Sequence, residues 1–272
     1  EEPAWAELGR IDPQGHGSHS YEINPGVPVR LSARVIRVSA NNGSVMTGPG
    51  TNSYLVGGGT ENEWAVIDPG PLDEAHVRAI VAAAPGPIRW IFATHTHNDH
   101  SPATVRLKAL TGAHVHGRRP AHPEWQDPSF APDTVLHGGE RIALPGGSTL
   151  RVIHTPGHAS NHLCYLLEEE RTLFTGDHVM QASTVVINPP DGDMAAYIAS
   201  LRDLLDEKLD WLAPGHGFLM AEPPRAIEWI IAHRLKREAK VVDALRTHAP
   251  ASAQTLLPVV YDDVSERLHP VA

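Results

Sequence analysis

The sequence predicts a mixed α/β fold in which two sheets pack face to face and helices cover their outer faces. Each half of residues 1–222 runs through short apolar segments of strand length and then through a helical segment. Two stacked sheets with helices outside would bury the apolar faces of both sheets. Histidine and aspartate recur where the predicted strands end, so rigid sheets would hold these side chains at their rim.

The first half of the chain combines an irregular arm, five strands and two helices. Residues 1–30 form the arm, because they are rich in glycine, proline, serine and histidine and have no clear period. The glycine-rich stretch 41–52 is expected to be a mobile loop, and Asp68–Gly70 has turn chemistry. Gly57–Gly59 indicates a hairpin. The expected elements are strands at 33–38, 53–56, 64–67, 88–93 and 113–116 and helices at 73–84 and 102–110.

The second half repeats this order and is followed by a shift in composition. A proline-rich loop at 118–132 precedes strands at 149–154, 163–167, 172–175 and 211–213 and a helix at 194–209. A long helix at 225–248, a shorter one at 255–261 and the start of a third from 265 follow. We therefore expect two domains, a catalytic one at 1–222 and an incomplete helical one at 223–272.

Composition limits the classes of function. The formal net charge of −10 opposes broad, non-specific binding to nucleic acid, which needs a basic surface. No stretch reaches the ~20 apolar residues of a membrane helix, and the N-terminus has no leader pattern, so no membrane association is expected. The single cysteine, Cys164, excludes an intramolecular disulfide, is expected to be a buried structural thiol, and favours a reducing, cytoplasmic location.

The stretch 94–100 concentrates groups that bind metal ions. It follows the predicted strand at 88–93, and imidazole and carboxylate are the ligands that suit zinc and related ions. With partners downstream, seven candidates result, which exceeds what one tetrahedral ion can use but suits two ions that share a carboxylate. The seven are His95, His97, Asp99, His100, His158, Asp177 and His216. A hydroxide bridging such ions is a nucleophile at neutral pH, so metal-assisted hydrolysis is predicted.

The motifs HxHxDH (95–100), TPGH (155–158), GD (176–177) and PGHG (214–217) resemble those of the metallo-β-lactamase superfamily, in order and spacing, over residues ~33–220. This resemblance implies a four-layer αββα sandwich. It also implies two zinc ions, one held by His95, His97 and His158, the other by Asp99, His100 and His216, with Asp177 as bridge. Asp99 and Asp177 are the predicted catalytic carboxylates.

Within the superfamily, an aspartate at 177 resembles the glyoxalase II, thioesterase and nuclease side. Residues 233–240 and 260–272 resemble the β-lactamase-like protein 2 branch, which carries a small winged-helix-like C-terminal domain and includes an endoribonuclease on single-stranded RNA. Two hydrolase substrates follow: a phosphodiester such as single-stranded RNA, or an acyl or thioester compound. The alternatives are a persulfide dioxygenase-type oxidoreductase with one Fe²⁺ at His95, His158 and Asp177, and a non-catalytic RNA-binding protein with a vestigial metal site.

Several polar residues near the motifs are candidates for contact with the substrate or the ligands. Asn52, Tyr54, His178 and Thr184 are predicted to overlook the metals and to bind substrate. His154 and His162, which flank His158, are candidates for a hydrogen bond to a metal ligand.

Overall fold

The computed structural model describes residues 23–59, 61–181 and 184–264. The chain divides into two compact units, one up to Pro223 and one from Pro224. The division falls beside the boundary expected from composition. The two units are described separately below.

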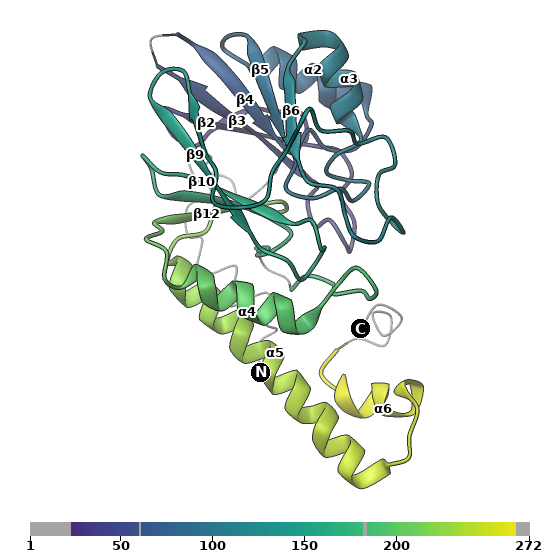
Figure 1. Cartoon of the computed structure of the whole chain (residues 1–272). Helices are drawn as coiled ribbons and strands as arrows, with labels where there is room; N and C mark the ends of the chain where they lie inside the picture. Colours follow the sequence, from purple (N-terminus) through teal and green to yellow (C-terminus); the bar gives the residue numbers. More distant parts are fainter. Residues whose placement is uncertain (1–22, 60, 182–183, 265–272) are drawn as a thin grey trace. The chain divides into compact units, whose positions relative to one another are not determined.

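The first sheet has seven strands in the order β1 to β7 (Figure 1). Pairing is antiparallel from β1 to β4 and parallel from β4 to β7. The strands are β1 (Val29–Arg30), β2 (Val35–Ser39), β3 (Asn52–Gly58), β4 (Glu63–Ile67), β5 (Ile88–Phe92), β6 (His114–Gly117) and β7 (Thr134–Val135). The five strands predicted for this half are present, with shifted ends. The two-residue strands β1 and β7 were not predicted, because they are too short to show a period.

The second sheet has five strands in the order β12-β11-β10-β9-β8. Only β11 and β12 pair in parallel. The strands are β8 (Arg141–Leu144), β9 (Ser148–His154), β10 (Leu163–Leu167), β11 (Thr172–Gly176) and β12 (Trp211–Pro214). The sequence did not predict β8, an edge strand whose side chains are largely exposed.

Helices cover the outer faces of the sheets, so the predicted αββα sandwich is confirmed (Figure 1). Helices α2 (Glu74–Ala83) and α3 (Ala103–Thr111) contribute Val77, Ile80 and Leu107 to a core on the outer face of the first sheet. Helix α4 (Met194–Leu204) lies beside the second sheet. It ends five residues before the predicted position, which was therefore wrong, because 205–207 form the tighter i→i+3 bonds of a 3₁₀ turn.

The main core lies between the sheets. Alternate side chains of each strand point to opposite faces, so Tyr54 enters this core while its neighbour Leu55 faces the helices. Ring contacts link the two sheets: the centroids of Tyr54 and Phe174 lie 5.0 Å apart, and those of Phe92 and Tyr165 lie 5.3 Å apart. Each buried aromatic or aliphatic side chain contributes roughly 1.5–3 kcal/mol to stability. The packing makes the strands a rigid base for the loops at their ends.

The second unit contains all but the first residue of α5 (Pro223–His248) and the whole of α6 (Ala253–Val260), which begins two residues before the predicted start. Ala244, Leu256 and Val260 form a small core. The basic side chain of Arg237 pairs with Asp263 at 2.7 Å and lies over the ring of Tyr261. The described part of this unit has two helices and no strand, so a winged-helix-like domain stays a prediction.

Two predictions fall on residues that the structure does not describe. The third C-terminal helix was expected from residue 265, and most of the irregular arm spans 1–22. In the described residues, no helix has the length and apolar character to cross a membrane.

Candidate metal centre

Four strand ends bring the seven predicted ligands to one rim of the sandwich. His95, His97, Asp99 and His100 follow β5, and the other three follow β9, β11 and β12. Backbone bonds join these loops: Gly215 N–H donates to the carbonyl of Gly176 at 2.8 Å. A Cβ at Gly215 would lie 2.7 Å from Asp177 Oδ1, so only glycine lets this loop approach so closely.

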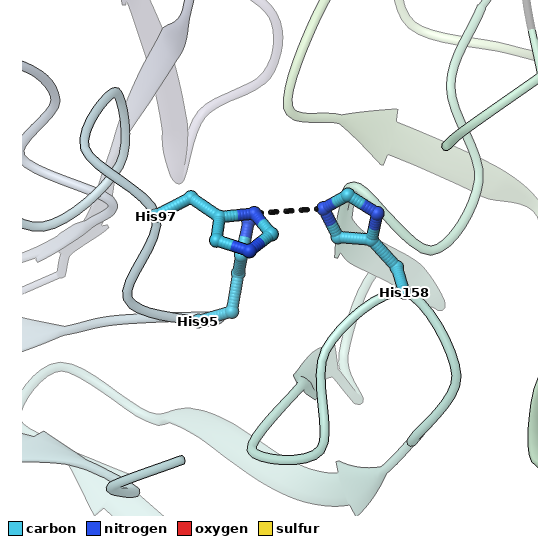
Figure 2. Close-up of side chains that lie close together, drawn as sticks. All are labelled: His95, His97 and His158. Atoms are coloured by element: carbon cyan, nitrogen blue, oxygen red, sulfur yellow. Dashed lines mark hydrogen bonds between the residues drawn. The ribbon is translucent and has the colours of Figure 1, made fainter. Parts of the chain in front are cut away.

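The first cluster consists of His95, His97 and His158, whose ligand atoms lie within 4.8 Å of one another. Nδ1 of His97 and Nε2 of His158 are 2.9 Å apart (Figure 2). Nδ1 of His158 donates to the carbonyl of Val186 at 2.6 Å, which leaves its Nε2 to face the cluster. His95 is buried, and its Nδ1 lies 3.0 Å from the hydroxyl of Thr94.

The second cluster consists of Asp99, His100, Asp177 and His216, also within 4.8 Å of one another. Nε2 of His100 lies 3.3 Å from both Asp99 Oδ2 and Asp177 Oδ1. Nε2 of His216 lies 3.3 Å and 3.2 Å from the same two oxygens. Nδ1 of His216 donates to the carbonyl of Gly50 at 3.2 Å, so both imidazoles direct Nε2 at the two carboxylates.

Asp177 lies between the clusters. Its Oδ1 belongs to the second cluster, and its Oδ2 lies 3.6 Å from Nε2 of His158 in the first. One carboxylate thus offers an oxygen to each side, as a bridging ligand does.

The donor atoms fit divalent cations. Nε2 of His95, His100 and His216 and Oδ1 of Asp177 are buried without a hydrogen-bond partner, which is costly unless an ion satisfies them. Ligands ~2.1 Å from a tetrahedral zinc ion are about 3.4 Å apart. The separations of 3.2–3.3 Å in the second cluster are close to that value.

The electrostatics of the two clusters differ. Burial lowers the pKa of His97 to about 4 and holds the pKa of His95 well below its usual value. Burial also acts against a charged His216, but the charge of Asp177 outweighs it and raises the pKa of His216 to about 9. His100 behaves likewise beside Asp99. Without metal the second cluster is therefore a set of imidazolium and carboxylate groups, and cations would displace its protons.

Asp68 orients His100, a role that its turn chemistry in the sequence did not predict. Its Oδ2 accepts from Nδ1 of His100 at 2.9 Å and from the Thr94 hydroxyl at 2.7 Å. Its Oδ1 accepts from the Thr94 backbone N–H at 2.7 Å. A carboxylate behind a histidine ligand fixes its tautomer and raises its basicity. The Asp-Pro-Gly turn after a strand was the available signal, but the partner of the carboxylate is set by tertiary structure.

Of the two histidines that flank His158, His162 makes the expected hydrogen bond to a ligand, whereas Nε2 of His154 donates to the carbonyl of Ser160 at 3.1 Å. Nε2 of His162 accepts from the backbone N–H of Asp177 at 3.2 Å, and its Nδ1 lies 2.9 Å from the hydroxyl of Thr155. The ring stacks on that of His95 with centroids 5.1 Å apart. His162 therefore supports a ligand of each cluster from behind.

The four predicted substrate residues lie in different settings. Asn52 and Tyr54 are buried in β3, where both donate to the carbonyl of Pro214 and fix the loop of His216. His178 is buried against Tyr197, away from solvent, and burial lowers its pKa to about 3. Substrate contact stays a prediction for these three, and their burial argues against it. Thr184 is half-buried, and its predicted contact also stays a prediction.

Fold and site together define a metal-binding αββα protein. Residues 46–216 match the family model for the metallo-beta-lactamase superfamily. The chain belongs to the metallo-beta-lactamase superfamily, and it is a hydrolase of that superfamily whose fold implies a divalent metal site.

Relatives and solved structures agree with this assignment. A beta-lactamase-like protein 2 homolog from Drosophila melanogaster is 33% identical over 89% of this chain and 85% of its own length. An atrochrysone carboxyl ACP thioesterase from Aspergillus chevalieri is 34% identical over 80% of this chain and 67% of its own. A metallo-beta-lactamase family protein from Thermus thermophilus shares the fold, with a TM-score of 0.71 and 21% identity over 85% of this chain and 89% of that one.

Proposed function

We propose that this protein is a dinuclear zinc hydrolase that cleaves thioesters of apolar acyl groups. The observation that carries the proposal is the pair of ligand clusters joined by Asp177, with one carboxylate oxygen on each side. A single ion would need only one cluster. The alternative with one Fe²⁺ uses His95, His158 and Asp177 and leaves the other three ligands of the second cluster without a role.

The residues of the chain supply positioning and proton transfer. Zinc ions bound here would polarise the thioester carbonyl and lower the pKa of water, so that a nucleophile forms at neutral pH. Asp99 is the second-cluster ligand with the most exposed side chain, 26%, and the neighbouring His100 overcomes the effect of burial and holds the pKa of Asp99 below its usual value. Its carboxylate therefore stays ionised and can accept a hydrogen bond that orients the attacking water, while the proton that the water loses goes to the leaving sulfur. The products are a carboxylic acid and a thiol.

An acyl substrate fits the surroundings of the site better than RNA does. Apolar side chains are exposed on two loops that contact the ligands through their backbone or side chains: Val45 and Met46 at 78% and 49%, and Trp125 at 74%. In the second unit, taken by itself, Arg237 and Lys240 pair with Asp263 and Asp262, so these two cations are not available to an RNA backbone. The thioesterases among the curated relatives support the same substrate class.

A cytoplasmic location also belongs to this proposal. Cys164 is buried, and burial raises the pKa of its thiol to about 12, as expected of the structural thiol predicted from the sequence. A chain whose one cysteine is buried suits a reducing compartment.

Parallel assays of the zinc-loaded protein test the proposal. Acyl-pantetheine thioesters, a single-stranded RNA and a persulfide are offered separately, with free thiol, RNA fragments and oxygen uptake as readouts. We expect thioester hydrolysis that is lost on chelation and restored by zinc. RNA cleavage without thioester hydrolysis would replace the proposed substrate, and oxygen uptake with one bound iron would replace the hydrolase.

A further inference from the structure

The proline-rich loop at 118–132 is fastened to the loop that carries the first ligands. Asp127 N–H donates to the carbonyl of Thr96 at 2.6 Å, and the Thr96 hydroxyl donates to Gln126 Oε1 at 2.7 Å. Gln126 also pairs with His97 in an isolated antiparallel bridge. Residues paired in this way have Cα atoms about 4.5–5.5 Å apart, so the position before Gln126 is next to a metal ligand.

A second clamp holds the same loop to the loop that follows His158. Asp191 accepts from Gln126 Nε2 at 3.1 Å and from the backbone N–H of His122 at 3.3 Å. The same carboxylate accepts from the backbone N–H of Ser160 at 3.0 Å. Asp191 therefore fixes the 118–132 loop with respect to the first cluster.

Trp125 lies between His122 and Gln126, which are both held by Asp191, and it has a strained backbone conformation. Its φ of +68° is in the left-handed region, which is a genuine outlier for a bulky residue. Its side chain is 74% exposed, so the indole gains little from burial. Strain that is held in place by surrounding bonds is typical of functional positions. The bonds on either side of Trp125 hold its backbone next to the loop of His97, and its large apolar ring is exposed to solvent.

A second loop with exposed apolar side chains contacts the ligands of the second cluster. Val45 and Met46 are exposed on the loop between β2 and β3, which ends at Gly50 and Thr51. The Gly50 carbonyl accepts from His216, and the Thr51 hydroxyl donates to Asp99 Oδ2 at 3.4 Å. Each cluster therefore anchors one loop with an exposed apolar residue.

We infer that Trp125 is the specificity-determining residue that binds the apolar acyl chain of the substrate, with its thioester at the metal centre. This inference rests on the proposed function. It predicts a preference for long acyl chains, because a longer chain covers more of the indole and removes more apolar surface from water.

The kinetic test compares acetyl- and decanoyl-pantetheine with the zinc-loaded wild type and the variant Trp125→Ala. For decanoyl-pantetheine we expect KM to rise about tenfold, as loss of roughly 60 Å² of apolar contact implies. For acetyl-pantetheine, KM and kcat stay at the wild-type values. Trp125→Phe keeps an apolar ring and retains most of the preference. Leu110 is an exposed apolar residue on α3, and Leu110→Ala is the matched control, which leaves KM and kcat for both substrates unchanged.

A binding test separates this inference from the proposed function. The probe is the decyl thioether of pantetheine, which cannot be hydrolysed, and calorimetry measures its affinity for wild type and Trp125→Ala. Weaker binding by the variant supports the inference even if no thioester is cleaved, in which case the proposed function alone fails. Equal binding by both proteins, or no binding by the wild type, overturns the inference. So does an equal loss of activity for acetyl and decanoyl substrates.

Discussion

The two ligand clusters lie next to each other but differ in the charge of their histidines when no metal is bound. His95, His97 and His158 contain no carboxylate, and burial keeps His95 and His97 neutral, which is the form that binds metal. The second cluster holds two carboxylates, and in the metal-free protein they keep protons on His100 and His216. The first cluster is thus ready to bind a cation, whereas the second must release protons to do so.

The supporting bonds differ in the same way. In the first cluster the nitrogen turned away from the site bonds to a neutral group, such as the Val186 carbonyl behind His158. In the second, His216 likewise bonds to the neutral carbonyl of Gly50, but His100 has the carboxylate of Asp68 behind it. A charged partner makes an imidazole a stronger donor to metal. Negative charge is therefore concentrated in the second cluster, and Asp177 brings one carboxylate oxygen to the first.

The largest effect is expected from removing the shared carboxylate. Asp177→Ala should lower kcat/KM at least about a thousandfold and leave less than one metal ion per chain, because both clusters lose a ligand. Asp203→Ala removes an exposed carboxylate within α4 and serves as control. Circular dichroism checks the fold, and activity assays with metal analysis check the effect. Near-normal turnover in Asp177→Ala would mean that the clusters do not work as a pair.

The next largest effect distinguishes the clusters. His97→Ala and His216→Ala should each retain one zinc ion per chain and lose most activity, since each removes a ligand of only one cluster. Metal analysis after dialysis gives the stoichiometry, and His114→Ala, at an exposed strand position, is the control. If either variant lost both ions, the clusters would have to be treated as a single site.

A smaller effect tests the charged support of the second cluster. Asp68→Asn should weaken the zinc of that cluster about ten- to a hundredfold and leave the first ion in place. The amide cannot accept equally well from both His100 and the two donors of Thr94. Competition with a chelator measures the two affinities. Equal weakening of both ions would contradict a role confined to the second cluster.

The smallest effect is expected at His76, a buried neutral histidine outside both clusters, and it concerns the pH dependence of stability. Burial lowers its pKa to about 4 in the folded protein, against about 6.5 when unfolded. Its contribution to stability is therefore complete above pH 6.5 and is lost as the pH falls through 4, by up to about 3 kcal/mol.

The matched variant is His76→Gln, which can still bond to the hydroxyl of Ser53 but does not titrate. In chelator-treated protein, urea unfolding should show that this variant loses less stability than wild type between pH 7 and pH 4. If the stability of the two proteins changed with pH in parallel, folding would not lower the pKa of His76.

The seven predicted ligands lie together because each one follows an apolar run of strand length and strand ends meet at the rim of a sheet, while metal binding by each of them stays a prediction. The sequence could not show that His178 points inward. The turn at Gly176, with φ of +47°, places Asp177 at the metal centre and sends its neighbour toward Tyr197. The role of Asp68 was hidden for a similar reason, since 32 residues separate it from His100. Such partnerships depend on packing between distant segments, which local patterns do not encode.

The central claim is that two cations share Asp177. Its most direct test is the metal content of the full chain after zinc loading and dialysis, measured by inductively coupled plasma mass spectrometry. The account predicts two zinc ions per chain. A chain that retains no divalent ion, or that retains a single iron under every loading condition, would contradict it.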